Sequence, residues 1–76
     1  MRIMYISDYD NTPVVECIDR ITYDIEACIM YLDVNGDDNT EYIIQGVKYD
    51  EYRKLAGEIL LNGYLDLTEY KVETTY

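Results

Sequence analysis

The pattern of apolar and polar positions divides the chain into short segments with the composition of strands. Residues 2–7 are an apolar run rich in β-forming residues, and the polar segment 8–13, with its one proline, is typical of a loop. Residues 29–34 and 41–47 flank a polar turn at 35–40, which predicts a β-hairpin. These segments predict a small, mostly antiparallel sheet.

Residues 14–32 fit two different structures. Their apolar positions recur at helical spacing, and Thr12 and Pro13 suit the cap and first position of a helix. However, residues 21–27 also alternate between apolar and polar side chains, and β-branched residues are common there. Both alternatives stay open, and we favour a strand from about residue 21 onward.

One helix is predicted between Asp50, which suits the cap, and Asn62-Gly63, which is typical of a helix end. Its apolar stripe comprises Tyr52, Leu55, Ala56, Ile59 and Leu60. Residues 64–72 then alternate as a closing strand. The sequence therefore predicts an α+β fold, with a small mostly antiparallel sheet packed with one or two helices in a single compact domain spanning residues 1–76.

Charge separates this chain from most domains of its size. Sixteen carboxylates oppose six basic side chains, and the formal net charge is −10. The acidic residues are spread from Asp8 to Glu73, while 49% of residues are apolar or aromatic and ten are tyrosine. This composition predicts a folded core with a negative surface. Nucleic acids and anionic membranes attract basic patches, so we expect neither of them as a direct partner. We expect the partner to be a basic protein.

The residue types present exclude several kinds of chemistry. The absence of histidine excludes Ser–His and Cys–His mechanisms, and no glycine-rich phosphate loop is present, so we expect no enzyme and no cofactor. Cys17 and Cys28 match no zinc motif, and we expect both to be small buried residues. The N-terminus does not read as a signal peptide and no segment reads as a membrane span, which predicts a cytoplasmic protein.

The segment 33–41 resembles the start of an EF-hand calcium loop through Asp33, Asn35 and Asp37. However, Asp38 stands where that loop needs glycine, and Ile44 stands where it needs a bidentate glutamate. We therefore predict a polar turn and no metal site.

The acidic surface itself is the candidate for function. A compact chain of this length has a diameter of roughly 30 Å, and duplex DNA of that length carries about 17 phosphate charges. In size, charge, a composition rich in Tyr, Asp, Asn and Ile, and α/β pattern, the whole chain resembles small acidic inhibitors of bacteriophages and mobile elements. These comprise DNA mimics, anti-CRISPR proteins and uracil-DNA glycosylase inhibitors. The resemblance, which we place nearest to anti-CRISPR proteins, implies a non-enzymatic inhibitor in the host bacterial cytoplasm. It would bind the basic nucleic-acid site of a host defence or DNA-processing complex, such as a Cas effector complex.

The residues expected to bind this partner are acidic and tyrosine positions in loops or on polar faces, where function often resides. They are Asp8, Tyr9, Asp10, Asp24, Glu26, Asp33, Asp37, Asp38, Glu41 and Tyr42. Two alternatives remain. One is an acidic protein–protein adaptor, and the other is a structural module that self-associates through a tyrosine-rich edge strand.

Overall fold

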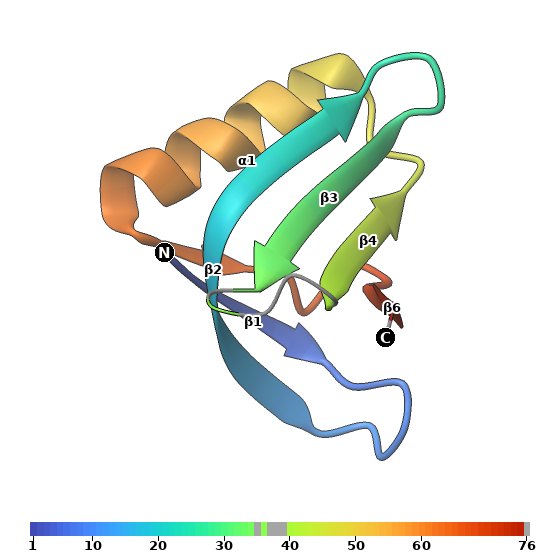
Figure 1. The fold of residues 1–76 in the computed structure, drawn as a ribbon, viewed down its shortest axis with the longest axis vertical. Helices are drawn as coiled ribbons and strands as arrows, with labels where there is room; N and C mark the ends of the chain where they lie inside the picture. The colour runs from blue at the N-terminus through green and yellow to red at the C-terminus, as the bar shows by residue number, and fades with distance from the viewer. Residues whose placement is uncertain (35, 37–39, 76) are drawn as a thin grey trace.

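In the part of the chain that the structure describes, a six-stranded curled sheet and one α-helix form the fold (Figure 1). The computed structural model describes residues 1–34, 36 and 40–75. The elements are β1 (Arg2–Ile6), β2 (Pro13–Asp24), β3 (Ile29–Val34), β4 (Glu41–Gln45), α1 (Tyr49–Asn62), β5 (Tyr64–Asp66) and β6 (Glu73–Thr75). This arrangement confirms the predicted α+β fold.

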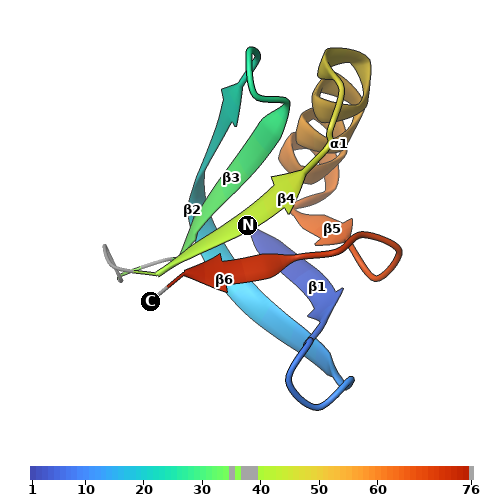
Figure 2. The same ribbon diagram turned by 90° about the vertical axis from the view of Figure 1, so that its right-hand side faces the viewer.

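The sheet has the strand order β5-β1-β2-β3-β4-β6, and only the β1–β5 pair is parallel among these described strands. β2 has 12 residues and pairs with β1 through its first half and with β3 through its second half. Between the halves, the register shifts at Ile18 and Arg20, as in a β-bulge. The sheet curls there, so that β1 and β6 approach each other (Figure 2).

The helical alternative for residues 14–32 is wrong, because these residues form β2, a turn and the first part of β3. The bulge explains the misleading pattern. Asp19 and Arg20 are both exposed, so the core-facing positions step from Ile18 to Ile21, and this spacing of three imitates a helix. β3 follows after a turn over residues 25–28, which confirms the strand favoured from residue 21.

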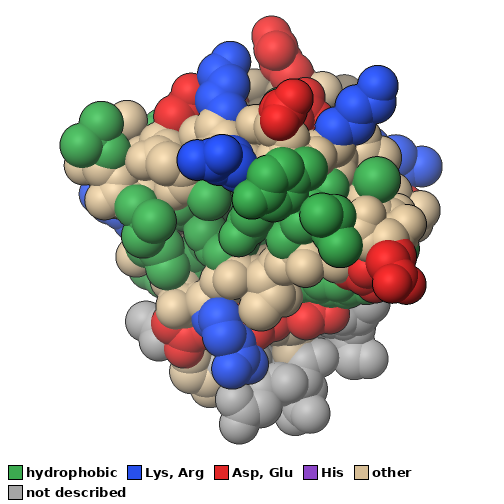
Figure 3. Space-filling model, turned by 90° about the horizontal axis from the view of Figure 1, so that it is seen from above, with side chains coloured by type: hydrophobic (Ala, Val, Ile, Leu, Met, Phe, Trp, Pro, Cys, Tyr) green, Lys and Arg blue, Asp and Glu red, His purple; other side chains and the backbone are tan. Residues whose placement is uncertain are grey.

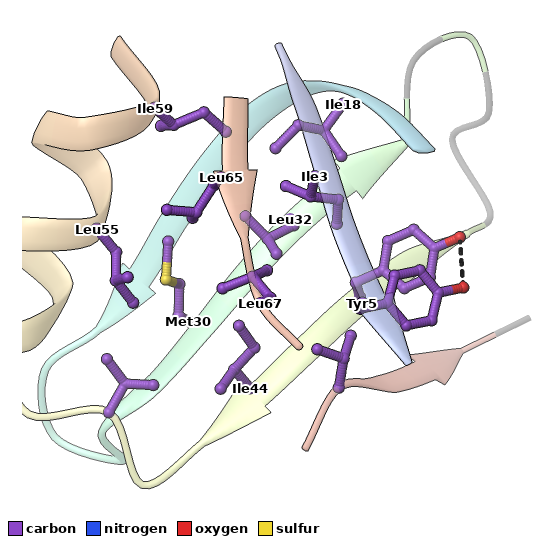
Figure 4. Close-up of a cluster of buried hydrophobic side chains, with 13 residues drawn as sticks. Ile3, Tyr5, Ile18, Met30, Leu32, Ile44, Leu55, Ile59, Leu65 and Leu67 are labelled. Atoms are coloured by element: carbon purple, nitrogen blue, oxygen red, sulfur yellow. Dashed lines mark hydrogen bonds between the residues drawn. The ribbon is translucent and has the colours of Figure 1, made fainter. Parts of the chain in front are cut away.

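The core lies inside the curl of the sheet and beneath α1 (Figure 4). Its buried side chains are Ile3, Tyr5, Ile18, Met30, Leu32, Tyr42, Ile44, Val47, Leu55, Ile59, Leu65, Leu67 and Val72. The rings of Tyr5 in β1 and Tyr42 in β4 have centroids 4.9 Å apart, and the Tyr5 hydroxyl donates to the Tyr42 hydroxyl at 3.3 Å. This contact joins two strands that are not neighbours in the sheet, so it ties the curl together.

Helix α1 differs from its prediction at one end and on one face. It begins at Tyr49, so Asp50 lies in the first turn rather than at the cap, where Lys48 makes no side-chain cap bond. The predicted end is confirmed, because Gly63 has a left-handed φ of 70° and its N–H donates to the Ile59 carbonyl at 2.8 Å. Leu60 is 76% exposed, so it does not belong to the buried stripe.

The predicted closing strand over 64–72 is correct only for its first residues. β5 ends at Asp66, whose carboxylate accepts the Thr68 N–H at 2.9 Å and the Thr68 hydroxyl at 2.7 Å. This turn directs the chain away from β1 and on to β6, which pairs with β4. The apolar alternation in this segment instead reflects Leu67 and Val72, which cover the core from a loop.

The cysteine prediction is wrong for Cys17, which is exposed, whereas Cys28 is half-buried. Cys17 precedes the buried Ile18 on β2, and neighbouring residues of a strand point to opposite faces. The Cys17 side chain therefore points away from the core.

The buried face of α1 gives a direct test of the fold. Ile59→Ala should lower the free energy of unfolding by about 2–5 kcal/mol, because it leaves a cavity where the side chain is 0% exposed. Leu60→Ala, at the next residue, should change it by less than about 0.5 kcal/mol. Urea unfolding followed by circular dichroism measures both, and equal losses would contradict the described helix orientation.

Candidate functional site

The ten residues predicted to bind a partner do not form one surface. Asp8, Tyr9 and Asp10 lie in the β1–β2 loop at one end of the longest molecular axis, which extends 30 Å (Figure 1). Residues 24 and 26 lie at the β2–β3 turn, at the opposite end (Figure 1). Asp33 and Glu41 face each other across β3 and β4 between the two ends.

Three of the predicted residues cannot be assigned to the surface: one is buried, and two lie outside the described residues. Tyr42 is only 5% exposed and belongs to the core, because the alternation of β4 turns Tyr42 and Ile44 inward. Its assignment to the partner-binding surface is therefore corrected. Asp37 and Asp38 lie outside the described residues.

Asp24 has a structural role at the β2–β3 turn. Its carboxylate accepts the backbone N–H groups of Glu26 at 3.0 Å and Ala27 at 3.1 Å, as Asp does in many tight turns. Glu26 is exposed on the same turn. The Asp24 carboxylate therefore stabilises the turn, whereas the Glu26 side chain takes no part in those two hydrogen bonds.

A groove forms where the β1–β2 loop meets β6. It has a volume of about 440 Å³, and its lining residues are Tyr5, Ser7, Asp8, Tyr9, Val72, Glu73 and Thr74. We call this the acidic groove. The sequence identified Asp8 and Tyr9 by their composition, but not Glu73, because the curl of the sheet brings residues 72–74 beside residues 5–9.

Local hydrogen bonds fix the loop that forms one wall of the acidic groove. Ser7 and Thr12 close it, with the Ser7 N–H donating to the Thr12 carbonyl at 2.8 Å. The Asp10 carboxylate accepts the Thr12 hydroxyl at 2.6 Å, and this bond holds the pKa of Asp10 below its ordinary value. Asp10 therefore stays ionised to a lower pH than an ordinary aspartate, and the loop presents Tyr9, which is 98% exposed, to solvent.

The acidic surface continues from the groove onto the outer face of β6, β4 and β3. Glu73 is aligned with Ile43, and its carboxylate accepts the side-chain N–H of Gln45 at 3.2 Å. Glu41 is the next outward residue of β4 beside Ile43, and Asp33 is aligned with it on β3. Diagonal neighbours on one sheet face lie roughly 7–8 Å apart, within reach of long side chains.

Glu41 carries the clearest electrostatic perturbation of this face, and it lies beside an ion pair of Asp33. Arg20 Nε donates to Asp33 Oδ2 at 2.7 Å, which forms an ion pair across β2 and β3. Partial burial raises the pKa of Glu41, and the hydrogen bonding and charge of Asp33 raise it further, while Arg20 acts in the opposite direction. The positive charge of Arg20 therefore acts on the carboxylates of both Asp33 and Glu41.

Three tyrosines form a separate cluster at the end of the molecule that holds the β2–β3 turn. The Tyr23 and Tyr52 rings stack with centroids 4.4 Å apart, and the Tyr23 hydroxyl donates to the Val47 carbonyl at 2.5 Å. Tyr49 lies beside them, with the Arg53 guanidinium carbon 5.9 Å from its ring centroid. Figure 3 shows a band of hydrophobic side chains across this end, with charged groups around it. These contacts attach the start of α1 to the sheet.

A second acidic patch, missed from the sequence, surrounds Tyr70. Burial raises the pKa of Tyr70, and the carboxylates of Glu51, Glu58 and Glu69 raise it further. This patch lies on α1 and the loop before β6. Like the acidic groove, it gathers several carboxylates, so substitutions in this patch can serve as controls for substitutions in the groove.

Comparison with known proteins identifies no relative: no protein-family model, curated protein or solved structure matches the chain. Within the described ranges, no group of three or more His, Cys, Asp or Glu residues is arranged to hold a metal ion. The single described helix is too short and polar to cross a membrane. The surface features described above, and foremost the acidic groove, are therefore what indicates a function.

The raised pKa of Glu41 predicts a dependence of stability on pH. Folding raises this pKa above its ordinary value of 4.5, so the folded protein holds the proton more tightly than the unfolded chain. The contribution of Glu41 to stability is therefore greatest below that value and is lost as the pH rises through the folded pKa. Relative to Glu41→Gln, the native protein should lose stability as the pH rises from the ordinary value of 4.5 towards neutral pH.

Urea unfolding across this pH range measures the difference. Glu26→Gln removes the same charge from the exposed turn and serves as the control, which should keep the native pH dependence. If Glu41→Gln and the native protein follow parallel curves, the described environment of Glu41 is incorrect.

Proposed function

We propose that this protein is a non-enzymatic acidic inhibitor that binds the basic nucleic-acid site of a partner protein through the acidic groove. The observation that carries the proposal is that no charged side chain among the described residues is buried in the core. Arg20 forms an ion pair with Asp33, and the chain as a whole keeps a net charge of −10. Such a surface attracts a basic partner and accelerates their association.

The dimensions of the molecule support binding in a nucleic-acid site. Its longest axis extends 30 Å, and duplex DNA of that length carries about 17 phosphate charges. The chain carries sixteen carboxylates in a body of 30 × 25 × 25 Å. The number of carboxylates per unit length is therefore close to the number of phosphates in the nucleic acid that the protein would exclude.

The acidic groove combines the two chemical groups that recognise arginine. The carboxylates of Asp8 and Glu73 can accept hydrogen bonds from a guanidinium, and the exposed ring of Tyr9 can stack on its plane. A lysine would gain the charge interaction but not the bidentate geometry. We infer an arginine-rich partner site, and the resemblance to anti-CRISPR proteins favours a Cas effector complex in the cytoplasm of a host bacterium.

Affinity capture from a nuclease-treated bacterial lysate tests the proposal. We expect recovery of a basic nucleic-acid-binding protein, which both high salt and added duplex DNA release, because DNA competes for the same site. Capture of a partner that added DNA or RNA fails to displace would favour the adaptor alternative and contradict the proposed inhibition.

Two double charge reversals, one in the acidic groove and one outside it, then test whether binding depends on the groove or only on the net charge. Asp8→Lys with Glu73→Lys should weaken binding of the captured partner at least tenfold, because both residues line the acidic groove. Glu58→Lys with Glu69→Lys changes the net charge equally at the patch around Tyr70 and should weaken it much less. Equal losses, measured by calorimetry, would show that only the overall charge matters.

A further inference from the structure

The outer face of β5, β1 and the first half of β2 is mostly apolar. Ile3 and Tyr5 point from β1 into the core (Figure 4), so Met4 and Ile6 point to the opposite face. Aligned cross-strand residues lie on the same face of a sheet. The register therefore places six apolar side chains together: Met4, Ile6, Pro13, Val15, Cys17 and Tyr64.

These side chains are accessible in a single copy of the chain. Val15 is 56% exposed and Tyr64 is 38% exposed, while Met4 and Ile6 are half-buried. Helix α1 sends Leu55 and Ile59 into the core, so it covers the inner side of the sheet and not this face. A contiguous apolar face of this kind marks an interaction surface in soluble proteins.

The charge of this face identifies its occupant. Besides the six apolar residues, the same register places Arg2 and Asp66 on it, so one cation and one carboxylate give it no net charge. The chain as a whole carries −10. Two copies repel each other through their acidic surfaces, but this face lets them meet without opposing like charges. In a two-fold pairing the same patch meets itself, so the cation of one copy can meet the carboxylate of the other.

We propose that a second copy of this chain binds this face, forming a two-fold symmetric dimer through β1, β2 and β5. Val15 and Cys17 become buried between the copies. Tyr5 lines the acidic groove from the opposite side of β1, so both grooves of the dimer remain open. The inference stands apart from the proposed function, since it depends only on the apolar face and its neutrality.

Analytical ultracentrifugation over a range of protein and salt concentrations tests the proposal. We expect a reversible dimer that strengthens with added salt, because salt screens the repulsion between two acidic copies. Val15→Lys should weaken dimerisation at least tenfold. Leu61→Lys adds the same charge at an apolar position that is 84% exposed on α1 and should not weaken it. A protein that stays monomeric up to about 1 mM overturns the proposal, as do equal effects of the two substitutions.

Thiol reactivity locates the interface without altering it. In a Cys28→Ser variant, the rate at which iodoacetamide alkylates Cys17 should fall as the protein concentration rises through the dimerisation range. In a Cys17→Ser variant, the rate for Cys28 should not depend on concentration. A dimer that leaves Cys17 equally reactive uses another surface and overturns the proposal. Protection of Cys17 in a monomer by zwitterionic lipid vesicles would also overturn it, by assigning the face to a membrane.

Discussion

The bend of β2 is the constraint on which the rest of this structure depends. One 12-residue strand serves two halves of the sheet, and the register shift between Ile18 and Arg20 allows the direction of the sheet to change. The curl encloses the core and brings Tyr5 of β1 against Tyr42 of β4. It also creates the acidic groove, because β6 reaches the β1–β2 loop only when the sheet closes in this way.

The two halves of the sheet present different outer faces, and this difference organises the surface. On β3, β4 and β6 the outward positions include Asp33, Glu41 and Glu73, continuous with the acidic groove. On β1, β5 and the first half of β2, six outward positions are apolar, and Arg2 and Asp66 add one charge of each sign. We propose that the acidic face binds a basic partner and that the mostly apolar face binds a second copy of the chain.

Local patterns predicted the elements that local interactions stabilise. The strand at the N-terminus, the hairpin of residues 29–45 and the helix end at Gly63 follow from composition and turn chemistry. The pattern of apolar residues did not distinguish strand from helix in β2, because the bulge gives this strand the spacing of a helix. Tyr42 was misjudged because the alternation of β4 defines two opposite faces but does not say which of them the core covers. Glu73 was missed because the curl of the whole sheet brings it beside the β1–β2 loop.

The central claim is that the acidic groove, rather than the acidic surface in general, recognises arginine. Titration of the isotope-labelled protein with a deca-arginine peptide, followed residue by residue in two-dimensional NMR spectra, tests it most directly. The account predicts that the largest shift changes fall at Ser7, Asp8 and Tyr9 and across the groove at Glu73 and Thr74. Changes spread evenly over all acidic residues, or centred on Glu58 and Glu69, would contradict it.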